Sequence, residues 1–270
     1  MTWCVAVIFL AVAVTLPAAA GSKGRRPDSS CKEVGPLLTS LSKRKVERDT
    51  DLVRLFQIGD RCNDDLIAGL NGPDFNVNVA AQEVIRYLGN RRGMEALDAW
   101  NSTNKKFYPV WGPVPVPIMD FDYKIIEASI LGDGAKDLGF LSARYIYALA
   151  LDNSPRAKQV FSRVARKVAS FGDDSLSKKT VNLLSSKNAL KPFDAKGGLE
   201  KAVLDNAIFL SAGEKGVAKA KLLGFNANKD KALIELDVSK GVLAEKRYHV
   251  VVSRNTHGWQ FFSINLVSVS

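Results

Sequence analysis

The apolar residues of this 270-residue chain follow one period along most of its length and another near its end. Between about residues 35 and 171 they recur at steps of three and four, which is typical of helices that bury one face. After residue 199 one more helical stretch is followed by alternating apolar and polar residues, which is typical of β-strands. The sequence therefore predicts an all-α domain followed by a small α+β domain.

The helical part predicts a series of helices joined by short turns. A short helix over residues 64–70 is expected to end at the turn Asn71–Asp74, and a third helix runs from Arg91 through Trp100. The long helix between them has one buried stripe, formed by Val77, Ala80, Ala81, Val84, Ile85 and Leu88. This order of elements predicts a helical hairpin with a core on one side.

A weaker copy of this arrangement begins about sixty residues later. A short helix over residues 126–131 precedes a long helix marked by Leu138, Leu141, Tyr145 and Leu149. A further helix over residues 155–171 is expected to start at Pro155, with Ser154 as its N-cap. The segment 64–100, "DDLIAGLNGPDFNVNVAAQEVIRYLGNRRGMEALDAW", resembles a HEAT-type repeat. That resemblance implies a protein partner bound along one helical face and no chemistry of its own.

The last seventy residues predict one helix and four antiparallel strands. The helix begins at Leu199, and the strands are expected at about 217–226, 231–238, 246–254 and 258–269, with residues 255–258 as a hairpin turn. The final strand is apolar on both faces, so it is expected to be central. Its segment "YHVVVSRNTHGWQFFSINLVSVS" resembles the cystatin-like, nuclear-transport-factor-like group. The resemblance implies a curved sheet around a helix, with pocket candidates Tyr248, His249 and Trp259.

These patterns divide the chain into five parts. We expect a signal peptide at 1–20, a flexible N-terminus at 21–34, the HEAT-like α-helical domain at 35–171, a linker at 172–198 and the α+β domain at 199–270. Trp3 to Leu16 is almost continuously apolar and is followed by Pro17 and three alanines, which is typical of a cleaved secretory signal. An uncleaved anchor is the alternative. We therefore expect a secreted or periplasmic protein without a transmembrane segment after cleavage.

Cleavage of the leader would leave two cysteines, Cys31 and Cys62. An even number of cysteines in an oxidising compartment favours a disulfide, which would contribute roughly 3 kcal/mol by constraining the unfolded chain. Two buried free thiols are the alternative. Neither cysteine lies in a C-x-x-C motif, so redox catalysis and structural zinc have little support.

The net charge of +10 predicts acidic partners, and no part of it comes from the first twenty residues. The candidates are an unidentified protein of the cell envelope, anionic lipids and anionic envelope polymers, whereas nucleic acid is disfavoured outside the cytoplasm. Partner-binding candidates are Tyr108 and Trp111 in the proline-rich segment 107–123, and Arg163, Arg166 and Lys167 on the helix over 155–171. The alternatives are that the aromatic residues supply core and that the basic face is merely solvated.

The search for catalytic motifs finds little. The chain has two histidines, His249 and His257, at no metal-binding spacing, and it lacks G-x-S-x-G and phosphate-binding glycine loops. No catalytic, cofactor-binding or metal-binding residue is therefore assigned. The sequence favours a non-enzymatic binding or scaffold protein that uses its helical-repeat surface. The alternative is a small-molecule-binding or weakly catalytic C-terminal domain.

Overall fold

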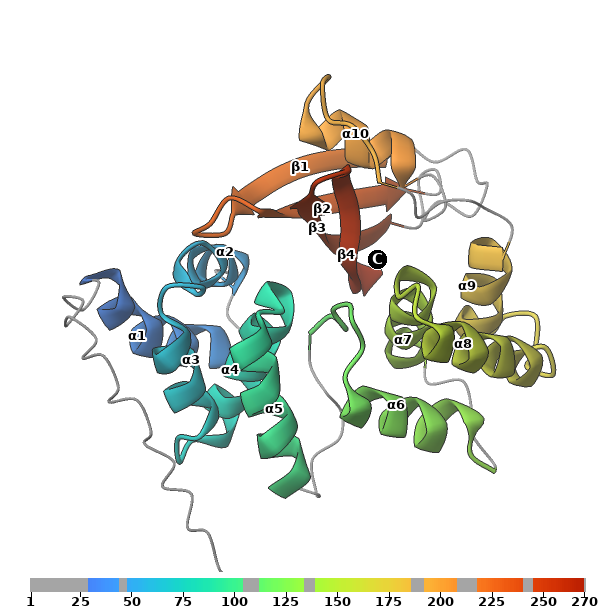
Figure 1. Cartoon of the computed structure of the whole chain (residues 1–270), viewed down its shortest axis with the longest axis horizontal. Helices are drawn as coiled ribbons and strands as arrows, with labels where there is room; N and C mark the ends of the chain where they lie inside the picture. Colours follow the sequence, from blue (N-terminus) through green and yellow to red (C-terminus); the bar gives the residue numbers. More distant parts are fainter. Residues whose placement is uncertain are drawn as a thin grey trace, which may run out of the picture.

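The computed structural model describes residues 29–43, 48–103, 112–133, 139–185, 192–207, 218–239 and 245–269. Within these residues the chain forms ten α-helices and a four-stranded antiparallel sheet. Figure 1 shows the helices α1–α5 and α6–α9 as two groups beneath the sheet. The predicted leader, Tyr108 and Trp111 lie outside the described residues.

The first group of helices begins after a 3-10 turn, η1 (Ser29–Glu33). Its helices are α1 (Val34–Ser42), α2 (Arg48–Ile58), α3 (Asn63–Leu70), α4 (Phe75–Leu88) and α5 (Arg91–Thr103). A disulfide joins Cys31 to Cys62, with 2.12 Å between the two Sγ atoms and 5.1 Å between the Cα atoms. It ties η1 to the start of α3, where Cys62 precedes the first helical residue.

Helix α4 has a capping residue at each end. The Asp74 carboxylate accepts hydrogen bonds from the backbone amides of Asn76 and Val77, which satisfies two of the amides exposed at a helix start. Gly89 ends the helix with a φ of 55°, a conformation that favours glycine. A Cβ at Gly89 would lie 2.3 Å from the Phe262 ring, so the end of α4 packs directly against the sheet.

The second group of helices shows one expected cap and two differences from the sequence analysis. Its elements are α6 (Asp120–Ile126), its π-helical continuation η2 (Glu127–Leu131), α7 (Phe140–Leu151), α8 (Pro155–Val168) and α9 (Leu176–Ser185). Ser154 caps α8 by accepting from the Ala157 amide, as predicted. The proline-rich segment 107–123 is not irregular to its end, because Phe121 and Tyr123 lie buried within α6. Helix α9 lies inside the range interpreted as a linker.

The C-terminal part contains one helix followed by a simple β-meander. Helix α10 spans Leu199–Asn206, and the strands are β1 (Ala218–Phe225), β2 (Lys231–Ser239), β3 (Glu245–Asn255) and β4 (Gly258–Val269). Their order in the sheet is β1-β2-β3-β4. All four strands expected from the sequence are therefore present, and residues 255–258 form the tight β3–β4 connection.

The expectation that β4 is a central strand is wrong, since β4 is the outermost strand of the meander. Helix α7 packs along it and covers its apolar side chains. The outer backbone edge of β4 also makes some hydrogen bonds. Phe193 exchanges two hydrogen bonds with Trp259, and the Val116 amide donates to the Phe262 carbonyl. A helix rather than a further strand therefore contributes to the burial of β4.

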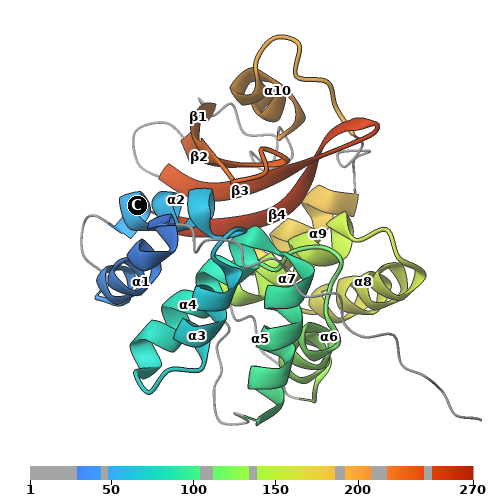
Figure 2. The ribbon, with the colours of Figure 1, turned by 60° about the vertical axis from the view of Figure 1, so that its left-hand side comes forward.

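The sheet lies between helices on both of its faces. Figure 2 shows α10 on the side away from all the other described helices. On the opposite side, α2 packs on β1, and Tyr87 of α4 contacts His249 of β3. The buried apolar residues from Val34 to Leu266 form one hydrophobic cluster. None of the described helices is both long enough and apolar enough to cross a membrane.

Candidate functional site

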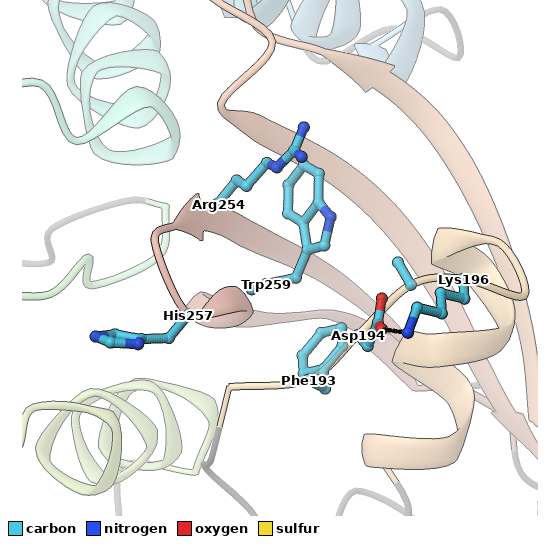
Figure 3. A pocket seen from close by; sticks show the side chains of 8 residues that line it. Phe193, Asp194, Lys196, Arg254, His257 and Trp259 are labelled. Carbon is cyan, nitrogen blue, oxygen red and sulfur yellow. Dashed lines mark ion pairs between the residues drawn. The ribbon is translucent and has the colours of Figure 1, made fainter.

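A surface pocket of about 470 Å³ lies at the β3–β4 hairpin. This volume is within the range of small-molecule sites in proteins. Figure 3 shows the side chains that surround it. The lining residues are Phe193, Asp194, Ala195 and Lys196 from the segment before α10, and Arg254, His257, Gly258 and Trp259 from the hairpin.

The pocket exists because the backbone of Phe193 pairs with that of Trp259. The Phe193 amide donates to the Trp259 carbonyl at 2.7 Å, and the Trp259 amide donates to the Phe193 carbonyl at 2.9 Å. Gly258 permits this approach, because its φ is 121° and a Cβ there would lie 2.7 Å from the Phe193 carbonyl oxygen. Two segments that are distant in the sequence thereby form opposite walls of the pocket.

The walls combine an aromatic ring with cationic groups. Arg254 and Trp259 are directly opposite each other in the β3–β4 register, so their side chains lie on the same face of the hairpin. In Figure 3, Trp259 lies between Arg254 and the ion pair of Asp194 with Lys196, whose oxygen and nitrogen are 3.1 Å apart. The hydrogen bond from Lys196 lowers the pKa of the exposed Asp194 carboxyl. Among the described residues, no acidic side chain pairs with Arg254.

The structure does not bring the three predicted pocket residues together. Trp259 lines the hairpin pocket, but Tyr248 and His249 are buried on opposite faces of β3. Burial raises the pKa of Tyr248, whose hydroxyl shares a hydrogen bond with that of Tyr147 of α7. His249 instead faces α2 and α4. Alternate residues of a strand point to opposite sides, so neighbours in sequence such as Tyr248 and His249 rarely share a pocket.

The basic candidates on the helical part lie on α8. Arg163 and Arg166 are exposed and Lys167 is half-buried. Arg163 forms an exposed ion pair with Glu127, at 3.2 Å. The buried stripe of this helix consists of Ala157, Val160, Val164 and Val168, so the basic side chains project from its other side. The structure gives α8 a basic outer face without showing what meets it.

A second polar cluster lies where the helices meet the sheet, and the sequence analysis did not find it. His249 of β3, Asp49 of α2 and Glu235 of β2 place one donor atom each within 4.8 Å of one another. The Tyr87 hydroxyl lies 3.0 Å from His249 Nδ1 and accepts from the Asn265 side-chain amide at 2.9 Å. Glu235 lies directly opposite His249 in the β2–β3 pairing. The sequence could have indicated this pair only if the register of the two strands had been known.

A buried ion pair joins α4 to α6. The Arg86 guanidinium donates to the Asp122 carboxylate at 2.8 Å, and both side chains are completely buried. Arg86 also donates to the Pro113 carbonyl at 3.2 Å. Burial raises the pKa of Asp122, although the charge and hydrogen bond of Arg86 oppose this shift. The pair lies away from the hairpin pocket and holds the two groups of helices together.

No family model, curated protein or solved structure matches this chain. The resemblances to HEAT repeats and to the cystatin-like group therefore remain predictions from sequence. The function has to be inferred from the geometry of the site itself.

Proposed function

We propose that this protein is a non-enzymatic binding protein whose hairpin pocket holds a small ring-shaped ligand with an acidic group. The observation that carries this proposal is the cross-strand pair of Arg254 and Trp259 beside Lys196. A sugar or aromatic ring would stack on the Trp259 indole, and its carboxylate or phosphate would face the two cations. The pocket has the size for such a ligand.

The lining residues favour binding over catalysis. A covalent mechanism needs a nucleophile with a base beside it. The eight lining residues supply no serine, threonine or cysteine, and His257 points away from Arg254 and Trp259 in Figure 3. Asp194 is already paired with Lys196. The polar groups of the pocket are therefore suited to hold a charge.

Isothermal titration calorimetry with matched probes tests this proposal. We expect glucuronate and benzoate to bind, and their uncharged counterparts glucose and benzyl alcohol to bind at least tenfold more weakly. Arg254→Gln removes the one of the two cations that has no acidic partner among the described residues and is expected to lose most of this difference. Trp259→Leu is expected to weaken both acids. Arg91→Gln, an exposed arginine on α5, is the matched control and is expected to bind like the wild type. Equal affinity for acids and neutral compounds would refute the proposal.

A second candidate function uses the helical face. The proposal is that α8 and its neighbours form a HEAT-like scaffold for an acidic protein or polymer of the cell envelope. It is supported by the α3–α4 hairpin and by the exposed basic side of α8. Among the described residues Phe75 of α4 is the one large apolar side chain that is exposed, so the outer face of α8 would bind through charge. Secretion or periplasmic location is part of this proposal, and the disulfide supports it.

This second candidate has its own test. The double variant Arg166→Gln/Lys167→Gln removes two cations from the outer face of α8 and leaves its buried stripe intact. If the scaffold binds through this face, we expect the wild type to retain an envelope-derived partner at low salt in a pull-down and the variant to lose it. Retention of the partner by the variant would exclude α8 as the binding surface.

A further inference from the structure

We propose that Asp49, Glu235 and His249 form a binding site for one transition-metal ion such as Zn²⁺, between α2 and the sheet. This site lies apart from the hairpin pocket and does not depend on the function proposed for it. Three donors come from three elements, namely the first turn of α2, the middle of β2 and the middle of β3. An ion held there would join a helix to two strands.

The donor atoms lie close enough together for small side-chain rotations to bring them to a single ion. Bonds of about 2.1 Å from zinc to nitrogen or oxygen place two ligands of one ion at most about 4.2 Å apart. His249 Nε2 and Asp49 Oδ1 are 3.9 Å apart, and all three donors lie within 4.8 Å of one another. Donor atoms of a tetrahedral zinc ion lie about 3.4 Å apart, so rotations of the Asp49 and Glu235 side chains that move their oxygens by about 1 Å would bring the three donors to one ion.

The surroundings of His249 orient its ring as metal sites require. Metal-bound histidines usually hold their second ring nitrogen in a hydrogen bond, which fixes the direction of the first. Here Nδ1 lies 3.0 Å from the Tyr87 hydroxyl, and the Asn265 amide donates to that hydroxyl. The arrangement turns Nε2 toward Asp49. In the metal-bound form Nδ1 would carry the ring proton and donate a hydrogen bond to the Tyr87 hydroxyl oxygen.

Access to the site is open on one side. The His249 side chain is 2 % exposed, whereas the Asp49 side chain is 44 % exposed. An ion could therefore enter past Asp49, and water would complete its coordination there. A partly open site with three protein ligands matches the pattern of metal sites that keep one position for water.

Nearby cations restrict which metals fit. Arg247 Nε lies 3.1 Å from Asp237 Oδ1 and 3.5 Å from Glu235 Oε2, so Asp237 can retain Arg247 when Glu235 turns to a metal. Lys219 and Lys221 lie opposite Asp237 and Glu235 on β1. These cations weaken purely electrostatic binding of Mg²⁺ or Ca²⁺. The imidazole ligand instead favours zinc, cobalt, nickel or copper.

Equilibrium dialysis of the untagged full chain against Zn²⁺, with metal content measured by mass spectrometry, tests this inference. We expect one equivalent of zinc per chain. Asp49→Asn and His249→Asn are expected to lower the affinity at least tenfold. Because Asp49 is half-exposed, its variant should fold even if the His249 variant does not. Asp51→Asn in the same helical turn and His257→Asn at the other histidine are the matched controls, and both should bind like the wild type.

The absorption spectrum of bound Co²⁺ gives a second readout. We expect visible bands of a cobalt site with nitrogen and oxygen ligands, and their loss in the Asp49→Asn variant. Less than 0.2 equivalents of zinc bound by the wild type at ten times the protein concentration would overturn the inference. Binding that the control variants lose as strongly as Asp49→Asn would overturn it as well, because it would show an unspecific site.

Discussion

Tyr87 and His249 meet at the boundary between helices and sheet, where the Tyr87 hydroxyl lies 3.0 Å from His249 Nδ1. Both side chains are buried, and Asn265 of β4 donates to the same hydroxyl. One tyrosine on α4 therefore satisfies polar groups on two strands. This network fixes how the helical layer sits on the sheet, and it is the natural place to begin testing the structure.

Tyr87→Phe is expected to destabilise the fold by about 1–3 kcal/mol. The phenyl ring keeps the packing, but the variant leaves polar groups of His249 and Asn265 buried without this partner, which carries a cost of this size. Urea unfolding monitored by circular dichroism measures the change. A loss of less than about 0.5 kcal/mol would mean that the hydroxyl does not hold the two layers together.

Asp122→Ala is expected to cost about 3–5 kcal/mol, because it leaves the fully buried Arg86 guanidinium without its carboxylate. The matched control is Asp120→Ala, two residues earlier on α6, whose ion pair with Arg156 is exposed. Exposed pairs contribute about 0–1 kcal/mol, so the control should be nearly neutral. Similar unfolding free energies for the two variants would contradict the buried pair.

The stability of the fold is expected to fall above about pH 10. Burial raises the pKa of Tyr147 well above its usual value, and the pKa of Tyr248 is raised for the same reason. Above pH 10 these tyrosines lose protons more readily in the unfolded chain than in the folded one, so the free energy of unfolding falls as the pH rises, by at most about 1.4 kcal/mol per pH unit for each tyrosine.

Tyr147→Phe should make this decline shallower without removing it, because Tyr248 still contributes. Urea unfolding at several pH values between about 9 and 11 measures the slope. Equal slopes for the wild type and the variant would show that Tyr147 does not titrate differently in the two states.

The double variant Cys31→Ser/Cys62→Ser is expected to lose about 3 kcal/mol, because the disulfide closes a loop between residues 31 positions apart. Thermal and urea unfolding of the variant measure this loss. Reduction of the wild type by a phosphine should have the same effect on unfolding. A variant as stable as the wild type would show that the loop from η1 to α3 is ordered without the bond.

The sequence predicted elements whose signals are local. Ser154 and Pro155, two neighbouring residues, mark the start of α8. The hairpin at residues 255–258 can likewise be predicted from the turn residues alone. The same reasoning misplaced β4, because apolar residues on both faces show that a strand is covered and not what covers it. Here α7 covers it.

Both candidate sites depend on contacts that no local pattern shows. Trp259 was predicted as a pocket residue, but its partner across the pocket, Phe193, lies before α10 and is joined to it by backbone hydrogen bonds. Asp49 and His249 come together through the packing of α2 on the sheet. Spacing in the sequence carries no information about such pairs. The pocket walls and the polar cluster can therefore be identified only from the three-dimensional structure.

The most direct test of the proposed binding function is the mapping of amide and indole chemical shifts in a ¹⁵N-labelled chain during titration with glucuronate. The account predicts a saturable shift of the Trp259 indole signal, together with backbone signals of residues 193–196 and 254–259. Glucose at the same concentration should leave them in place. Shifts confined to α8, or no saturable shift at all, would contradict the hairpin pocket as the binding site.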